Sequence, residues 1–117
     1  AGGRVYVASG NAGLTSSHGA YTINAVSGNL ASLGEGFGAQ GVSATQSAGG
    51  PLAISAPYNG SGDTVGITDT VIRNIFESSA ALSGGRGSFS LKAKSSSLTP
   101  SASDYTETLT LVAVAQF

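Results

Sequence analysis

The last fourteen residues of the chain, Asp104 to Phe117, alternate between two faces with a period of two. A period of two is typical of a β-strand whose faces have different environments. The face that carries no threonine is formed by Tyr105, Leu109, Leu111, Ala113, Ala115 and Phe117. The pattern predicts a strand that continues to the last residue and is paired on both sides, because an unpaired chain end frays.

Similar alternation predicts strands elsewhere in the chain, over residues 4–9, 20–26, 51–56 and 88–94, with a weaker one over 63–68. In the 88–94 strand, Phe89 and Leu91 point inward, while Lys92 and Lys94 point outward. Residues 95–103 form a polar loop that leads into the terminal strand. We therefore expect the 88–94 strand and the terminal strand to pair antiparallel.

Two segments are harder to assign. Residues 30–50 are rich in glycine and alanine and show no clear period. In residues 69–80 the apolar side chains recur with helical spacing behind a capping Thr68 or Asp69, although β-branched residues favour strands. We favour a short helix around 69–80 that covers one end of a sandwich.

The composition indicates an all-β protein. Of 117 residues, 18 are glycine and only 9% are charged, which excludes a solvated helical bundle and favours short strands joined by turns. This length suits one domain. We expect a single immunoglobulin-like β-sandwich.

Charge and residue types narrow the possible partners. The net charge is −1 and the basic residues form no run, so no footprint for nucleic acid or an anionic membrane is present. The sequence has no run of apolar residues long enough to span a membrane. It begins with Ala1-Gly2-Gly3, which we interpret as the start of a mature secreted chain.

The residue types of the chain do not favour a catalytic or cofactor site. The chain has no cysteine and one histidine, His18, so we expect neither an enzyme nor a metal or cofactor site. The run Gly36 to Gly41 has the letters of a dinucleotide fingerprint, but no helix pattern follows it.

A glycine-rich loop carries two further candidate sites. Asn59, Ser61 and Asp63 alternate in it as calcium ligands do, but we interpret it as an ordinary turn. Asn59 also begins the sequon Asn-Gly-Ser and is a candidate glycosylation site.

The N-terminal strand has two interpretations. Arg4, Val5, Tyr6 and Val7 form either the first edge strand of the chain's own sandwich or a donor strand that pairs with a neighbouring subunit. In the second case, residues 1–9 are the donor strand, 10–19 a loose hinge loop and 20–117 the β-sandwich domain.

The run Tyr105-Thr106-Glu107-Thr108, leading an alternating strand that ends on Phe117, resembles the C-terminus of pilins of the archaic chaperone–usher class, the spore coat U family. The resemblance implies a pilin-like sandwich with a groove filled by the next subunit's N-terminal segment, and assembly by a periplasmic chaperone and an outer-membrane usher. Val5 and Val7 are the implied donor residues. The groove would be lined by Leu109, Leu111, Ala113, Ala115 and Phe117, together with Phe89 and Leu91 of the preceding strand.

From these patterns we expect the structural subunit of an extracellular filament at the cell surface, a pilus or fimbria that functions in adhesion and assembles as a homopolymer by donor-strand exchange. Two other classes stay open. One is a viral or phage capsid, decoration or tail protein, and the other is a secreted carbohydrate-binding module.

Overall fold

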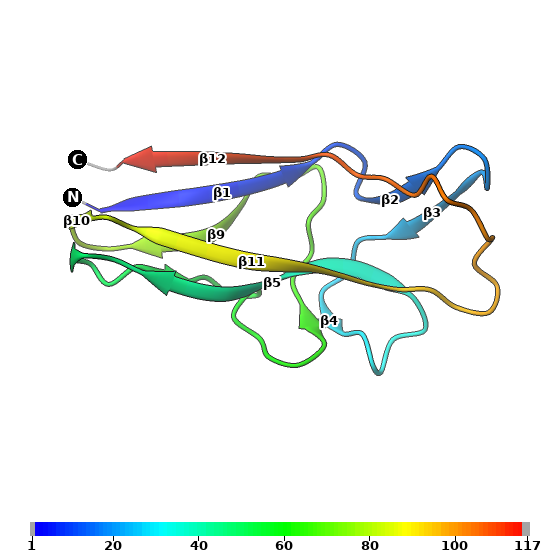
Figure 1. Ribbon diagram of the computed structural model, residues 1–117, viewed down its shortest axis with the longest axis horizontal. Helices are drawn as coiled ribbons and strands as arrows, with labels where there is room; N and C mark the ends of the chain where they lie inside the picture. The colour runs from blue at the N-terminus through cyan, green and yellow to red at the C-terminus, as the bar shows by residue number, and fades with distance from the viewer. Residues whose placement is uncertain (1, 116–117) are drawn as a thin grey trace.

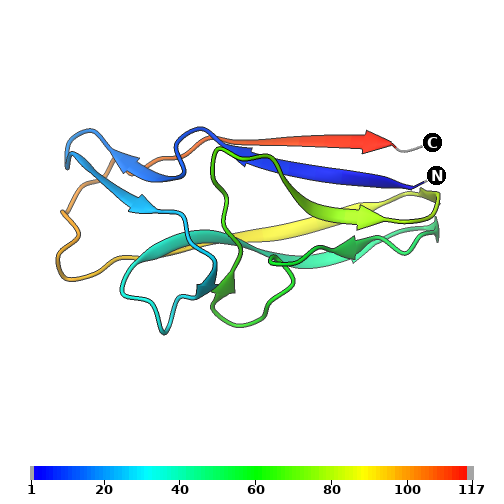
Figure 2. The ribbon, with the colours of Figure 1, turned by 180° about the vertical axis from the view of Figure 1, so that it is seen from behind.

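Four antiparallel strands form the larger layer of the protein, whose computed structural model describes residues 2–115 (Figure 1). Their order across the sheet is β12 (Leu109–Ala115), β1 (Gly3–Ser9), β9 (Arg73–Ser78) and β7 (Ala53–Ile54). β12 pairs with β1 over seven residues, from Gly3 opposite Ala115 to Ser9 opposite Leu109. The first and last strands of the chain are therefore neighbours, and both described chain ends lie at the same end of the molecule (Figures 1 and 2).

The second layer is a long ribbon of two antiparallel strands, β5 (Gly36–Thr45) and β11 (Arg86–Lys94). It packs against the four-stranded sheet, so the protein is a β-sandwich, and the all-β prediction is confirmed. No helix occurs among residues 2–115, and hence none with the length and apolar character of a membrane span.

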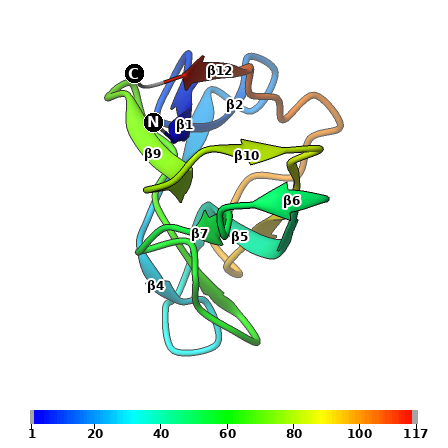
Figure 3. The ribbon, with the colours of Figure 1, turned by 90° about the vertical axis from the view of Figure 1, so that its left-hand side faces the viewer.

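Three short pairs of strands complete the fold. β2 (Gly13–Ser16) and β3 (Tyr21–Asn24) form a hairpin at the end of the molecule opposite the termini (Figure 1). β4 (Gly28–Asn29) pairs with β8 (Thr64–Val65). β6 (Ala48–Gly49) pairs with β10 (Leu82–Ser83) near the termini (Figure 3).

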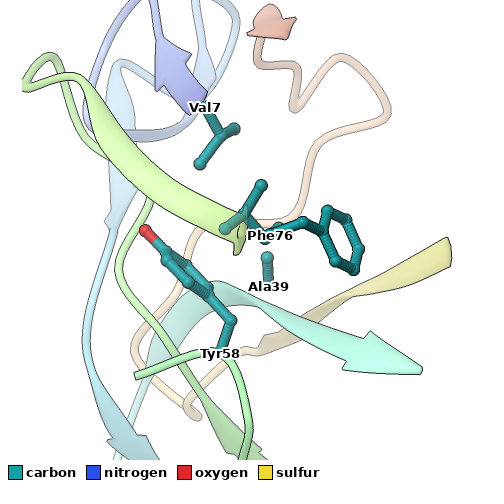
Figure 4. Packing of buried hydrophobic residues seen from close by; sticks show 5 residues of the cluster. Val7, Ala39, Tyr58 and Phe76 are labelled. Atoms are coloured by element: carbon teal, nitrogen blue, oxygen red, sulfur yellow. The ribbon is translucent and has the colours of Figure 1, made fainter. Parts of the chain in front are cut away.

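The core lies between the two layers (Figure 4) and consists of Val7, Ala39, Tyr58, Ile75 and Phe76. The side chain of Tyr58 is fully buried, and its hydroxyl donates a hydrogen bond of 2.5 Å to the carbonyl oxygen of Ile67. That bond satisfies the polar end of the ring, as a buried tyrosine requires.

The sequence pattern did not predict β5, because the start of this strand is covered on both faces. Residues 36–40 are all buried, so no polar face exists to reveal the alternation. A Cβ added at Gly38 would lie 2.6 Å from Cγ2 of Val65, so a larger residue does not fit there. The fingerprint-like glycines of residues 36–41 thus serve close packing within a strand, and no helix follows them.

The short helix expected around 69–80 is wrong, because Arg73–Ser78 is strand β9. A β-bulge inserts an extra residue at Ile75, where Val5 and Tyr6 of β1 pair with Phe76 and Asn74. Consecutive Ile75 and Phe76 are both buried as a result. Together with the exposed Val71 and Ile72 they imitate a helical spacing.

The expected pairing between the 88–94 strand and the terminal strand is also wrong. β11 pairs with β5 along its whole length, and β12 pairs with β1. The two strands belong to different layers and each is an edge strand, so in the described part of the chain no other strand pairs with their outer edges.

Candidate functional site

An open apolar groove lies between the two layers at the end of the molecule that carries the termini. Its volume is about 800 Å³. β1, β9, β11 and β12 contribute to its walls, as do the residues around β10. The large apolar side chains that line it are Val5, Leu52, Phe76, Leu82, Phe89 and Leu111.

The strands beside this groove point core-type side chains into open space. Leu111 lies opposite Val7 on the adjacent strand, and Leu91 opposite Ala39, so each shares a face with a fully buried core residue. Yet Leu111 is 48% exposed and Leu91 is 50% exposed. The sandwich is therefore not closed between β12 and β11.

The two edges differ in their protection against strand addition. β12 reads Leu-Thr-Leu-Val-Ala-Val-Ala and carries neither a charged residue nor a proline. β11 carries Arg86, Lys92 and Lys94. Because charges and prolines are what commonly keep an edge strand from pairing with another chain, β12 is the edge that accepts a partner more readily.

The floor of the groove depends on one glycine. A Cβ added at Gly87 of β11 would lie 2.8 Å from Cζ of Phe76, so the ring packs directly over the main chain of β11. Phe76 is 4% exposed and still contributes to the groove wall. The close approach brings β9 and β11 together at the base of the groove.

Four of the residues expected to line an acceptor groove line this one: Phe89, Leu111, Ala113 and Ala115. Leu91 and Leu109 lie on the same strands but outside its wall, and Leu109 packs against the core. Phe117 lies outside the described residues. Sequence reasoning missed Leu52, Phe76 and Leu82. Leu52 belongs to a predicted strand that was not assigned to the groove, Phe76 to the segment expected to be a helix, and Leu82 to a segment without a clear pattern.

β1 lies within the sheet of its own domain, as in the first of the two interpretations of the N-terminal strand. Residues Arg4 to Val7 lie between β12 and β9 in the chain's own sheet, and Val7 is 1% exposed. Among residues 2–115, β12 has only this strand as a ladder partner. A donor role therefore requires β1 to leave this position and occupy the same one in another copy.

The first half of β1 is nevertheless accessible from the groove. Gly3, Arg4 and Val5 line it, whereas Val7 is covered by the core. Arg4 lies 4.0 Å from Glu77 across the β1–β9 ladder, and both side chains are nearly half exposed. An exposed pair of this kind contributes little to stability, so main-chain pairing and the two valines hold the strand.

Residues 10–19 are not a loose loop, because they contain β2 and are tied to the segment that precedes β12. Glu107 accepts hydrogen bonds from the amides of Asn11 (3.1 Å) and Gly13 (3.0 Å). Thr15 and Thr106 form a two-way bridge, with N–H to carbonyl distances of 2.9 and 3.0 Å.

Asp104 makes the second carboxylate tie to this segment. It accepts hydrogen bonds from the hydroxyl of Ser16, from the amide and hydroxyl of Ser17 at 3.0 Å each, and from the amide of His18 at 3.1 Å. Nδ1 of His18 lies 3.0 Å from Oδ2 of Asp104. The Ser16 bond and then the His18 amide hold the pKa of Asp104 well below its usual range.

A rigid apolar turn projects beside the end of β1. Asp69 pairs with Arg73 through two hydrogen bonds of 2.8 and 2.7 Å, and the bond from Arg73 lowers the pKa of Asp69. Asp69 also accepts from the amide of Val71 and offers its carbonyl to the amide of Ser9. This arrangement presents Val71 and Ile72, which are 54% and 69% exposed.

The remaining candidate residues form no site. His18 is a surface side chain whose neighbour is Asp104. Asn59, Ser61 and Asp63 are exposed, and within residues 2–115 no three acidic or histidine side chains converge as metal ligands do. Asn59 lies on an exposed turn, where a glycosylation sequon would be accessible.

The surface also bears on the carbohydrate-binding alternative. In the described part of the chain, the exposed large apolar side chains are all aliphatic, and each of the four tyrosines is at least partly buried. Sugar-binding platforms depend on exposed aromatic faces, so this surface does not favour that class.

Comparisons with protein-family models, with curated proteins and with solved structures gave no significant match.

Proposed function

We propose that this protein is the structural subunit of an extracellular filament, in which β1 of one copy takes the place of β1 in the next copy. The observation that carries the proposal is that β12, within the described residues, pairs with β1 alone, and that an open apolar groove beside this pair exposes the first half of β1.

Exchange of β1 preserves the strand pairing of β1. The same seven pairs with β12 and the same pairs with β9 form, but between two molecules instead of within one. Each copy donates one strand and accepts one. Where the strand comes from one neighbour and goes to another, the contact is head-to-tail and continues without closing, whereas mutual exchange between two copies would close a dimer. Repeated head-to-tail contacts generate a filament.

The groove supplies a route for the exchange. An arriving strand meets Gly3 to Val5 of the resident β1 from the open side and displaces it from its exposed half first. Its valines then enter the positions of Val5 and Val7, while its main chain pairs with β12. Affinity in such strand addition comes from main-chain hydrogen bonds and specificity from alternate side chains.

Disulfide trapping tests the proposal cleanly, because the chain has no natural cysteine. Ala8 of β1 and Thr110 of β12 are direct partners, within the separation that a disulfide spans. We expect the double variant Ala8→Cys/Thr110→Cys to form intermolecular bonds in assembled material, seen as a ladder of covalent oligomers without reductant.

The matched control is Ser43→Cys/Ser88→Cys, which joins β5 to β11, two strands that stay in one molecule. It should give covalent monomers only. Filaments visible by negative-stain electron microscopy, with Ala8→Cys/Thr110→Cys trapped solely as a monomer, would falsify strand exchange.

A further inference from the structure

The two carboxylate ties set a limit on how much of the N-terminal segment can move. We propose that the exchanged segment ends at Ser9, that Gly10 is the pivot, and that Asp104 and Glu107 retain residues 11–18 in their own molecule. This inference rests on the proposed filament function and specifies the part of the chain that passes between copies.

The type of hydrogen bond that holds the main chain changes at Gly10. Residues 3–9 are held chiefly by main-chain pairs to β12 and β9, which an incoming β1 reproduces one for one. Beyond Gly10 the contacts change character. Four main-chain amides, those of Asn11, Gly13, Ser17 and His18, are bound by the carboxylates of Glu107 and Asp104.

The hairpin that follows Gly10 also holds the retained segment in its own molecule. β2 pairs with β3 through a turn at residues 17–20, so residues 13–16 are tied to their own chain on that side as well. On the other side, Thr15 bridges Thr106. Moving residues 3–9 breaks the pairing of β1 with β12 and β9. Moving residues 11–18 as well would also break the β2–β3 pairing, the Thr15–Thr106 bridge and the hydrogen bonds to Asp104 and Glu107.

Gly10 itself has few contacts. It is exposed, and a Cβ added there would meet only Glu107 and Thr108 at ordinary contact distances of 3.5 Å or more. Its amide makes one main-chain bond, of 3.0 Å, to Thr108. Glycine also reaches backbone conformations that other residues do not, which suits a point where the chain changes direction.

Two cysteine pairs on either side of Gly10 locate the pivot. Ala8→Cys/Thr110→Cys reports on the exchanged strand, and Thr15→Cys/Thr106→Cys reports on the retained segment. In assembled filaments we expect the first pair to give covalent oligomers and the second to give covalent monomers. A further pair within the hairpin, Thr15→Cys/Thr22→Cys, is a control that should give covalent monomers, because both positions lie on the same side of Gly10.

The outcomes separate this inference from the function on which it rests. Oligomers from both the Ala8 and the Thr15 pairs would show that strands exchange but that the pivot lies beyond Ser16, which overturns the inference alone. Monomers from both pairs in filaments would overturn strand exchange and the pivot together. Oligomers from the first pair and monomers from the second support both.

Discussion

Val5 of β1 lies directly opposite Ala113 of β12, so the first strand of the chain supports the last. Across residues 2–115, β12 has no other ladder partner, and its opposite edge borders the groove. The stability of the terminal strand is therefore inseparable from the presence of a β1, whichever molecule supplies it.

Removing residues 1–9 should leave β12 without a partner and expose the core around Ile75 and Phe76. We expect the truncated chain to lose most of the roughly 5–15 kcal/mol that stabilises a domain. A synthetic peptide of residues 1–10 added in trans should restore a cooperative thermal transition, measured by circular dichroism, because it supplies the missing strand.

The control for this complementation is the same peptide with Val7→Asp, which carries a charge to a position that is 1% exposed. Rescue by both peptides, or by neither, would contradict the idea that β1 is an exchangeable unit held by its inward valines.

Substituting one valine on each of two adjacent strands compares the stability contribution of a buried side chain with that of an exposed one. Val7→Ala removes methyl groups from the core and should lower the free energy of unfolding by about 1–3 kcal/mol, as buried large-to-small substitutions do. Val112→Ala, on a side chain that is 49% exposed, should change it by about 0.5 kcal/mol or less. Urea unfolding of the two variants measures both values, and equal losses would mean that the assigned faces of the sheet are incorrect.

Gly87→Ala should destabilise the protein, because the added Cβ meets the ring of Phe76 at 2.8 Å and one of them has to shift. Overpacking of this kind costs about 1–3 kcal/mol. Gly34→Ala is the matched control, since a Cβ there meets nothing within 4 Å. Thermal midpoints of the two variants should differ, with only the Gly87 variant shifted downward.

The Asp104 tie predicts a specific dependence on pH. The pKa of Asp104 is lower in the folded protein than in the unfolded chain, where it is about 3.9, so its contribution to stability is complete above that value. It is lost as the pH falls below about 4 toward the pKa of the folded state. Asp104→Asn should therefore reduce stability at pH 7 and show a smaller further loss on acidification than the parent protein.

Urea midpoints at pH 7 and pH 3 provide the measurement. Asp69, whose pKa is lowered by Arg73, keeps part of the acid dependence in both proteins. Asp63→Asn is the control, because that side chain is exposed and makes no hydrogen bond among the described residues. An Asp104→Asn variant with the parent's midpoint at both pH values would show that the tie does not contribute to stability.

The alternation of the chain revealed strands in which inward and outward side chains alternate, including β1, β11 and β12. It could not reveal β5, because the start of that strand is covered on both sides and is built from small residues such as Gly38 and Ala39. It misassigned Arg73–Ser78, because the bulge at Ile75 breaks the period of two. In both cases the deciding information is which strands come to lie nearby, and a local pattern does not contain it.

The alternation of side chains predicted only part of the candidate groove. Inward positions on β11 and β12 followed from their alternation, but the gap between the strands did not, since a loop joining two strands normally predicts a hairpin. The ties made by Asp104 and Glu107 were visible only as two acidic residues beside Tyr105. Their targets are main-chain amides about ninety residues away, which carry no sequence signal.

The pivot at Gly10 also has a mechanical consequence for a filament built as proposed. With no slack between the exchanged strand and the tied segment, tension along the filament passes directly into the β1–β12 ladder. The exchanged strand and the segment held by Glu107 both meet this ladder at the end where Ser9 pairs with Leu109, so tension acts first on the pairs at that end. The pairs toward Gly3 and Ala115 are loaded only after the pairs at the Ser9 end have opened.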